Sequence, residues 1–395
     1  MDENSLNNEE RSRDEEPARA DSTESSVAEK AFDGDSTPEM AADTDTAAVC
    51  EVHAEEEPRE KISFGKTYGH FALIFGALFA FVAVTIIFQY VALFLVEAYA
   101  PQLVDMDGFD ALLSMIPFYC VGFPAGIIML LFARKFPDGE KKSITFGKWL
   151  KFFCIAVAMM YAGTILSEMV NVFIRFIPGA KVFDVSEEIL GGPLWLSFIV
   201  TVIIAPVLEE LLFRKLFIDR LRGFGEKFAI LISALCFGLF HGNFSQLFYT
   251  FIIGLLFGYI YSKTRNIWYT ISLHASINLV FGIVSIPISE FANEWNNAVS
   301  GLFEGGDVAI ETIVSMLPTL VVPMIVSTLY SLFIMALVVC GIVFFVTELK
   351  KKPAFDAPCC ELATGKFSVA AIWANVGFWL FALYVLLSFV SSIFI

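Results

Sequence analysis

The chain has 395 residues, of which 57% are hydrophobic and 42 are phenylalanine, and its formal net charge is −16. This apolar composition excludes an ordinary soluble domain and is typical of a protein that crosses the membrane several times. The charge is confined to one end, because residues 1–60 contain 20 acidic and 5 basic side chains. Such acidity argues against nucleic acid as a partner and against anionic lipid surfaces.

Residues 1–66 are expected to form a disordered acidic tail on the cytoplasmic side. This segment is rich in Asp, Glu, Ser, Thr and Ala. It therefore cannot bury enough apolar surface to offset the entropy lost on ordering. It also lacks the basic and then apolar pattern of a signal peptide. The seven cysteines show no metal-ligand spacing, and we expect them to be reduced thiols.

Residues 67–395 are expected to form an all-α, polytopic transmembrane helical bundle of about nine spans, with eight as the alternative. The apolar runs cover about 71–98, 111–132, 149–176, 194–218, 228–244, 247–261, 267–288, 313–346 and 367–395. The fifth and sixth runs are short, so they could instead pair as a shallow hairpin. Gly254 and Gly258 in the sixth run predict close helix contact. Pro318 and Pro323 are expected to break the eighth run near one end.

The distribution of basic residues predicts the orientation of this bundle. Lysine and arginine gather in the connections after the second, fourth, sixth and eighth runs, while the other connections carry almost none. Cytoplasmic loops of membrane proteins are enriched in Lys and Arg. We therefore expect a multi-pass protein of the cell membrane with its amino terminus in the cytoplasm and its carboxyl terminus outside.

Within the fourth run, three charged side chains fall in six residues: Glu209, Glu210 and Arg214. A charge at the centre of a spanning helix costs about 2.5–3.5 kcal/mol on insertion scales, so charged groups retained there are paired or functional. Glu210 and Arg214 are four residues apart and share a helix face, so we expect them to pair. Glu209 is rotated about the helix axis by about 100° from Glu210, so we expect it to face a group other than Arg214. Pro206 removes a helical hydrogen bond and is expected to kink the helix.

Two of the four histidines lie in later apolar runs of the same third of the chain. His241 follows Phe237 by four residues, so the phenylalanine can pack against or orient the imidazole ring. His274 precedes Asn278 by the same spacing, so both can point into one cavity. A carboxylate and an imidazole can polarise a water for attack on a peptide bond. A second imidazole and an amide can donate hydrogen bonds to the oxyanion that forms.

Two other interpretations remain open from these residues. Glu209 with His241 and His274 is also a possible zinc set of two histidines and one glutamate, although no H-E-x-x-H helix is present. A transporter could relay protons through Glu168, Glu209 and the histidines. Transporters usually show inverted repeats and paired broken helices, and neither is evident here. Glu168 and Asn171 are instead expected to stabilise the third span.

The three motifs, Glu209-Glu210-x-x-x-Arg214, Phe237-x-x-x-His241 and His274-x-x-x-Asn278, resemble those of the CPBP (CAAX protease and bacteriocin-processing) family of intramembrane glutamic endopeptidases. The resemblance covers residues 194–281. It implies that Glu209 and His241 activate the water and that Glu210 and Arg214 position Glu209. It further implies that His274 and Asn278 form the oxyanion site, and that no metal or other cofactor is needed.

One position departs from this family, because Lys215 stands where many members have glycine. The resemblance implies a peptide or protein substrate, lipidated or not, and leaves open whether it is a prenylated carboxyl terminus or a peptide precursor such as a bacteriocin. The alternative from another class is a non-catalytic membrane scaffold or immunity protein that binds a partner through the same fold.

Overall fold

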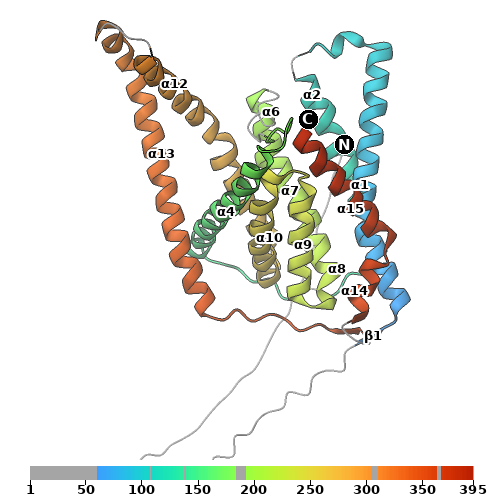
Figure 1. Ribbon diagram of the computed structural model, residues 1–395. Helices are drawn as coiled ribbons and strands as arrows, with labels where there is room; N and C mark the ends of the chain where they lie inside the picture. Colours follow the sequence, from blue (N-terminus) through green and yellow to red (C-terminus); the bar gives the residue numbers. More distant parts are fainter. Residues whose placement is uncertain are drawn as a thin grey trace, which may run out of the picture. The chain divides into compact units, whose positions relative to one another are not determined.

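The computed structural model describes residues 60–106, 108–137, 139–183, 193–304, 310–362 and 366–394 (Figure 1). The acidic tail lies outside the described residues, and the tail boundary predicted at residue 66 falls within the first helix. In chain order the elements are β1 (Glu60–Ile62), α1 (Phe64–Tyr99), η1 (Pro101–Leu103), α2 (Phe109–Ile116), η2 (Pro117–Gly122), α3 (Phe123–Leu131), α4 (Phe146–Ile174), α6 (Leu194–Phe198), η3 (Ile199–Ile204), α7 (Ala205–Glu209), η4 (Glu210–Ile218), α8 (Asp219–Leu221), η5 (Arg222–Phe224), α9 (Glu226–Phe240), α10 (Phe244–Thr264), α11 (Ile267–Ile277), η6 (Asn278–Ile283), α12 (Ser285–Glu304), α13 (Ile310–Lys350), β2 (Cys360–Leu362), α14 (Lys366–Trp373) and α15 (Val376–Phe394).

The fold is an all-α polytopic bundle, as predicted, and β1 and β2 add one short parallel pair. Within the described residues, eight helices are long and apolar enough to cross a membrane. The fifth predicted span is α9, which has 15 residues and is shorter than the roughly 20 residues that a bilayer requires. The count of eight agrees in number with the eight-span alternative, but α10 has 21 residues and is itself one of the eight, so the fifth and sixth runs do not form the shallow hairpin on which that alternative rested.

The basic connections meet at one end of the bundle. The Phe136 N–H donates to the Asp219 carbonyl, and the Lys142 N–H donates to the Thr264 carbonyl. The loop after α3 is therefore fixed to the start of α8 and the end of α10. The Asp356 N–H donates to the Glu226 carboxylate, which brings the segment after α13 to the start of α9.

The opposite end of the bundle collects the connections that carry few basic residues. The Lys181 N–H donates to the carbonyl of Ile393, at the end of α15. The Ser245 hydroxyl, at the start of α10, donates to the carbonyl of Phe183. Although α9 is short, the chain thus passes from the basic end at Glu226 to the other end by residue 245. The loop after the third span, the turn after α9 and the end of α15 thus lie at the end opposite the basic connections.

The prediction that prolines break the eighth span is wrong. The single helix α13 continues through Pro318 and Pro323, and its apolar part runs over Val321–Lys350. A proline removes one backbone hydrogen bond, and this loss does not outweigh the many bonds that a long apolar helix retains. The helix packs against α4 and pairs with α12.

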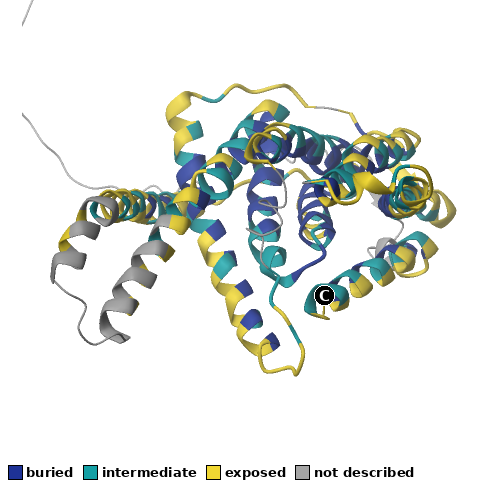
Figure 2. Cartoon of the chain, turned by 90° about the horizontal axis from the view of Figure 1, so that it is seen from above, coloured by how far each residue is buried: buried dark blue, intermediate teal, exposed yellow. Residues whose placement is uncertain are grey.

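Close contact between α9 and α10 confirms the role predicted for two glycines. A Cβ atom added at Gly254 would lie 3.1 Å from the Cα atom of Ala234, and one added at Gly258 would lie 3.0 Å from a side-chain carbon of Ile230. Larger residues at these positions would separate the two helices. Figure 2 shows buried residues along the inner helices and exposed residues along the outer ones. The η4 helix is largely enclosed, and two of its three charged residues, Glu210 and Arg214, are fully buried.

Candidate functional site

The acidic motif lies on a helical stretch whose turns are partly widened. The Ala205 N–H bonds to the Val200 carbonyl, five residues earlier, as in a π-helix. Pro206 follows and has no N–H to continue this register. Glu209 ends α7, and Glu210 begins the next widened segment, η4. The local irregularity predicted for Pro206 is thus a change of helical register.

The pairing predicted between Glu210 and Arg214 is confirmed. The Arg214 Nε atom lies 3.1 Å from Glu210 Oε2, and both side chains are 0% exposed. The guanidinium also lies over the ring of Phe237, 4.2 Å from the centroid, and 5.7 Å from the centroid of Phe257. A desolvated cation above an aromatic ring gains about 2 kcal/mol. The two rings therefore help to hold the arginine beside Glu210.

His274 lies between the two glutamates. Its Nδ1 atom is 3.0 Å from Glu210 Oε1, and its Nε2 atom is 3.8 Å from Glu209 Oε2. A carboxylate accepts hydrogen bonds, so Nδ1 carries a hydrogen and donates to Glu210. The longer separation exceeds a direct hydrogen bond. The side chains of Glu209 and His274 are each 11% exposed, so this part of the site has narrow access from outside.

His241 is held by the residue that the sequence pairs with it. Its Nδ1–H donates to the Phe237 carbonyl at 2.9 Å, and the Phe237 ring meets the imidazole edge to face at 5.0 Å between centroids. The Phe237 ring also lies 6.0 Å from that of His274. Nε2 of His241 makes no hydrogen bond to the described residues. Phe237 therefore contacts both histidines and Arg214.

Asn278 reaches the helix that carries the glutamates. Its Nδ2 atom donates to the Thr201 carbonyl at 2.8 Å. Lys215, the position that departs from the family, lies 2.7 Å from Asp219 Oδ2 and 3.1 Å from the Tyr261 hydroxyl. The lysine thus pairs with a buried carboxylate toward the basic end of the bundle.

Glu168 is not part of this site. It accepts a hydrogen bond from Asn171 at 3.2 Å and lies 4.0 Å from Arg175, both on the third span or at its end. These contacts favour the structural interpretation over a proton relay. Within the described part of the chain, no group of three His, Cys, Asp or Glu side chains is arranged to hold a metal ion.

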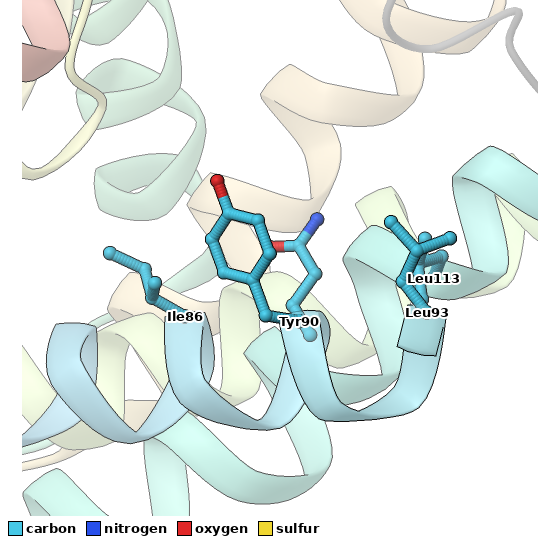
Figure 3. A pocket seen from close by; sticks show the side chains of 5 residues that line it. Ile86, Tyr90, Leu93 and Leu113 are labelled. Carbon is cyan, nitrogen blue, oxygen red and sulfur yellow. The ribbon is translucent and has the colours of Figure 1, made fainter. Parts of the chain in front are cut away.

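A hollow of about 290 Å³ lies elsewhere, between α1 and α2 (Figure 3). It is lined by Ile86, Gln89, Tyr90, Leu93 and Leu113. Tyr90 is 70% exposed, so the hollow is an open surface feature. None of the motif residues lines it, and we do not assign the chemistry to it.

Two residues of the site were not predicted from the sequence. Phe257 supports Arg214 from α10, and no pattern distinguishes it from the other phenylalanines. Thr201 supplies the carbonyl that Asn278 binds. The sequence does contain a signal for Thr201, because it precedes Pro206 by five residues. That spacing marks Thr201 as the carbonyl without a donor only once the i to i−5 hydrogen bonding of this segment is known.

Comparison with known proteins places this site in a family context. Residues 191–280, which contain all three motifs, match the model of the family described as "Type II CAAX prenyl endopeptidase Rce1-like". The chain is similar to "Putative membrane peptidase YdiL" of Bacillus subtilis, with 27% identity over 194 residues, which cover 45% of this chain and 76% of the relative.

Two proteins of Lactococcus lactis are also similar. "UPF0177 protein YxdF" is 34% identical over 98 residues, covering 24% of this chain and 54% of its own, and "UPF0177 protein YbdI" is 28% identical over 148 residues, covering 35% and 77%. No solved structure matches the chain.

The chain therefore has helices suited to a multi-pass membrane protein and a segment, residues 191–280, that matches the model of the CAAX prenyl endopeptidase family. The family resemblance indicated by the three motifs is thereby confirmed, and the comparisons support a peptidase of the CAAX type.

Proposed function

We propose that this protein is an intramembrane endopeptidase in which Glu209 activates a water molecule for attack on a peptide bond. The observation that carries the proposal is the placement of His274 between Glu209 and Glu210, with Nδ1 bound by Glu210 and Nε2 directed at Glu209. A separation of 3.8 Å leaves both Glu209 Oε2 and His274 Nε2 within reach of one shared water. Glu209 accepts a proton from that water as its oxygen bonds to the substrate carbonyl carbon.

The remaining groups have supporting roles in this proposal. Arg214 pairs with Glu210, and Glu210 orients His274, as a buried carboxylate orients the histidine of a catalytic triad. His241 keeps Nε2 available to polarise the water, with Phe237 fixing its ring. Two groups are available to donate to the oxyanion: Nε2 of His274, when the ring carries a second proton, and the amide hydrogen of Asn278 that is not bound to Thr201. When the intermediate collapses, the C–N bond breaks and the proton held by Glu209 passes to the amine.

The proposal needs no metal ion. In this proposal the carboxylate of Glu209 and the two histidines supply the acid–base chemistry of the attack. Because the side chains of Glu209 and His274 are almost fully buried, bulk water would be kept from the reacting charges. We place the basic end of the bundle, and with it the amino terminus, in the cytoplasm because of its Lys and Arg content.

Cleavage of a farnesylated peptide ending in a CAAX sequence tests the proposal, with the protein in lipid nanodiscs. Glu209→Gln keeps the shape of the side chain and removes the base, so we expect turnover to fall at least a thousandfold. Glu168→Gln is the matched control, because Glu168 is a glutamate of a spanning helix outside the site, and it should cleave as the native protein does. Equal activity of Glu209→Gln and native protein would refute the mechanism. A protein that binds but never cleaves would favour the scaffold.

A further inference from the structure

The contact between Asn278 and Thr201 completes a hydrogen-bond pattern that the sequence of η3 leaves open. Ala205 bonds five residues back, to Val200. In the same register the next N–H would bond to Thr201, but residue 206 is a proline and has none. The Thr201 carbonyl therefore loses its donor within the helix. Inside a membrane, an unsatisfied backbone carbonyl costs several kcal/mol, so a replacement donor is strongly favoured.

Asn278 supplies that donor from another helix. Its Nδ2 atom lies 2.8 Å from the Thr201 oxygen. Asn278 is one turn after His274, and Thr201 is two turns before Glu209. The hydrogen bond therefore joins the helix that carries His274 to the helix that carries Glu209. A second link between the same two helices is the bond from His274 to Glu210.

We infer that Asn278 is a positioning residue, whose amide replaces the backbone hydrogen bond that Pro206 removes and thereby fixes His274 between the two glutamates. One link would leave the helices free to rotate or slide about it, whereas two links at different heights fix both the height and the rotation of His274. This inference rests on the proposed function for its catalytic consequence, but the placement of His274 is a property of the folded protein alone.

The first test is thermal unfolding in nanodiscs of four proteins: native, Asn278→Ala, Pro206→Ala, and the double variant. Alanine at 206 restores an N–H that can bond to Thr201. The loss of Tm caused by Asn278→Ala should therefore be less than half as large in the Pro206→Ala background. Equal losses in both backgrounds would overturn the inference, since Asn278 would then not replace the missing donor. The double variant also covers the case in which Asn278→Ala alone does not fold.

The second test follows His274 directly and requires no substrate. The chain contains four histidines, so ¹⁵N-histidine labelling gives few signals. The Nδ1–H signal of His274, hydrogen-bonded to Glu210, is assigned by its loss in His274→Gln. Asn278→Ala should shift this signal. Asn375→Ala is the matched control, because Asn375 is also buried and donates to a backbone carbonyl, that of Tyr68, away from the site. It should lower the Tm without moving the His274 signal.

Turnover of the farnesylated peptide then separates positioning from direct catalysis. A positioning role predicts that Asn278→Ala lowers kcat at least tenfold, with KM little changed, together with the shifted His274 signal. If kcat falls while the signal stays in place, Asn278 acts only through its free amide hydrogen at the oxyanion, and the inference that it positions His274 is wrong. If the native protein cleaves nothing, the proposed function fails, but the unfolding and NMR results still decide the inference.

Discussion

The ion pair of Glu210 and Arg214 gives the most quantitative prediction for stability. The variant Arg214→Met keeps much of the side-chain volume but leaves the carboxylate of Glu210 buried without its cation. At the observed 3.1 Å, and with an effective dielectric constant of about 20, the Coulomb attraction is about 5 kcal/mol. Loss of one partner of a buried pair usually costs about 3–5 kcal/mol. We expect Arg214→Met to lower the free energy of unfolding by this amount.

A second variant separates the buried charge from other effects of the substitution. The double variant, Glu210→Gln with Arg214→Met, has no buried charge at these two positions. The amide oxygen of the glutamine introduced at 210 can still accept the hydrogen bond from His274. This double variant should recover most of the lost stability, because replacing both members of a buried pair is often nearly neutral.

Equilibrium unfolding in detergent micelles measures these differences. Arg175→Met is the control, since the Arg175 side chain is 62% exposed and lies 4.0 Å from Glu168, and it should change stability by less than about 1 kcal/mol. A loss below about 1 kcal/mol for Arg214→Met would refute the reasoning. So would a double variant no more stable than the single one.

Three further predictions concern the surroundings of the site. Tyr261→Phe removes the hydroxyl that donates to buried Asp219 at 2.8 Å, so unfolding should become easier by about 1–3 kcal/mol, measured by the same titration. Gly163→Ala places a Cβ atom 2.3 Å from the Cα atom of Tyr249, so α4 must move away from α10 and the Tm should fall. An unchanged Tm would contradict this close approach of the two helices. Peptide cleavage should survive prolonged dialysis against EDTA, whereas activity lost with the chelator and restored by zinc would exclude the metal-independent mechanism.

The sequence allowed much of the site to be predicted because its charges lie in apolar surroundings. Glu209, Glu210 and Arg214 are conspicuous in a spanning helix, and the four-residue spacing correctly paired Glu210 with Arg214. The spacing of Phe237 and His241 likewise predicted a contact that the structure contains. Helical periodicity determines which neighbours on one helix meet, so predictions of this kind are dependable.

Contacts between helices were harder to predict. Periodicity places His274 and Asn278 on one face, but it does not say that the histidine bonds to Glu210 or that the asparagine bonds to a carbonyl of another helix. The continuity of α13 through its prolines was also missed, because the penalty for a proline depends on what else satisfies the freed carbonyl. The contacts of His274 and Asn278 depend on tertiary packing rather than on local pattern.

The central claim, that Glu209 is the base of an intramembrane peptidase, is tested most directly by comparing protein termini in membranes. Cells that carry the native chain are compared with cells that carry Glu209→Gln at equal abundance. We predict that an uncleaved precursor accumulates only with the glutamine variant, and that the precursor identifies the substrate. Identical termini in the two membranes, with a binding phenotype retained, would contradict the claim and favour a non-catalytic scaffold.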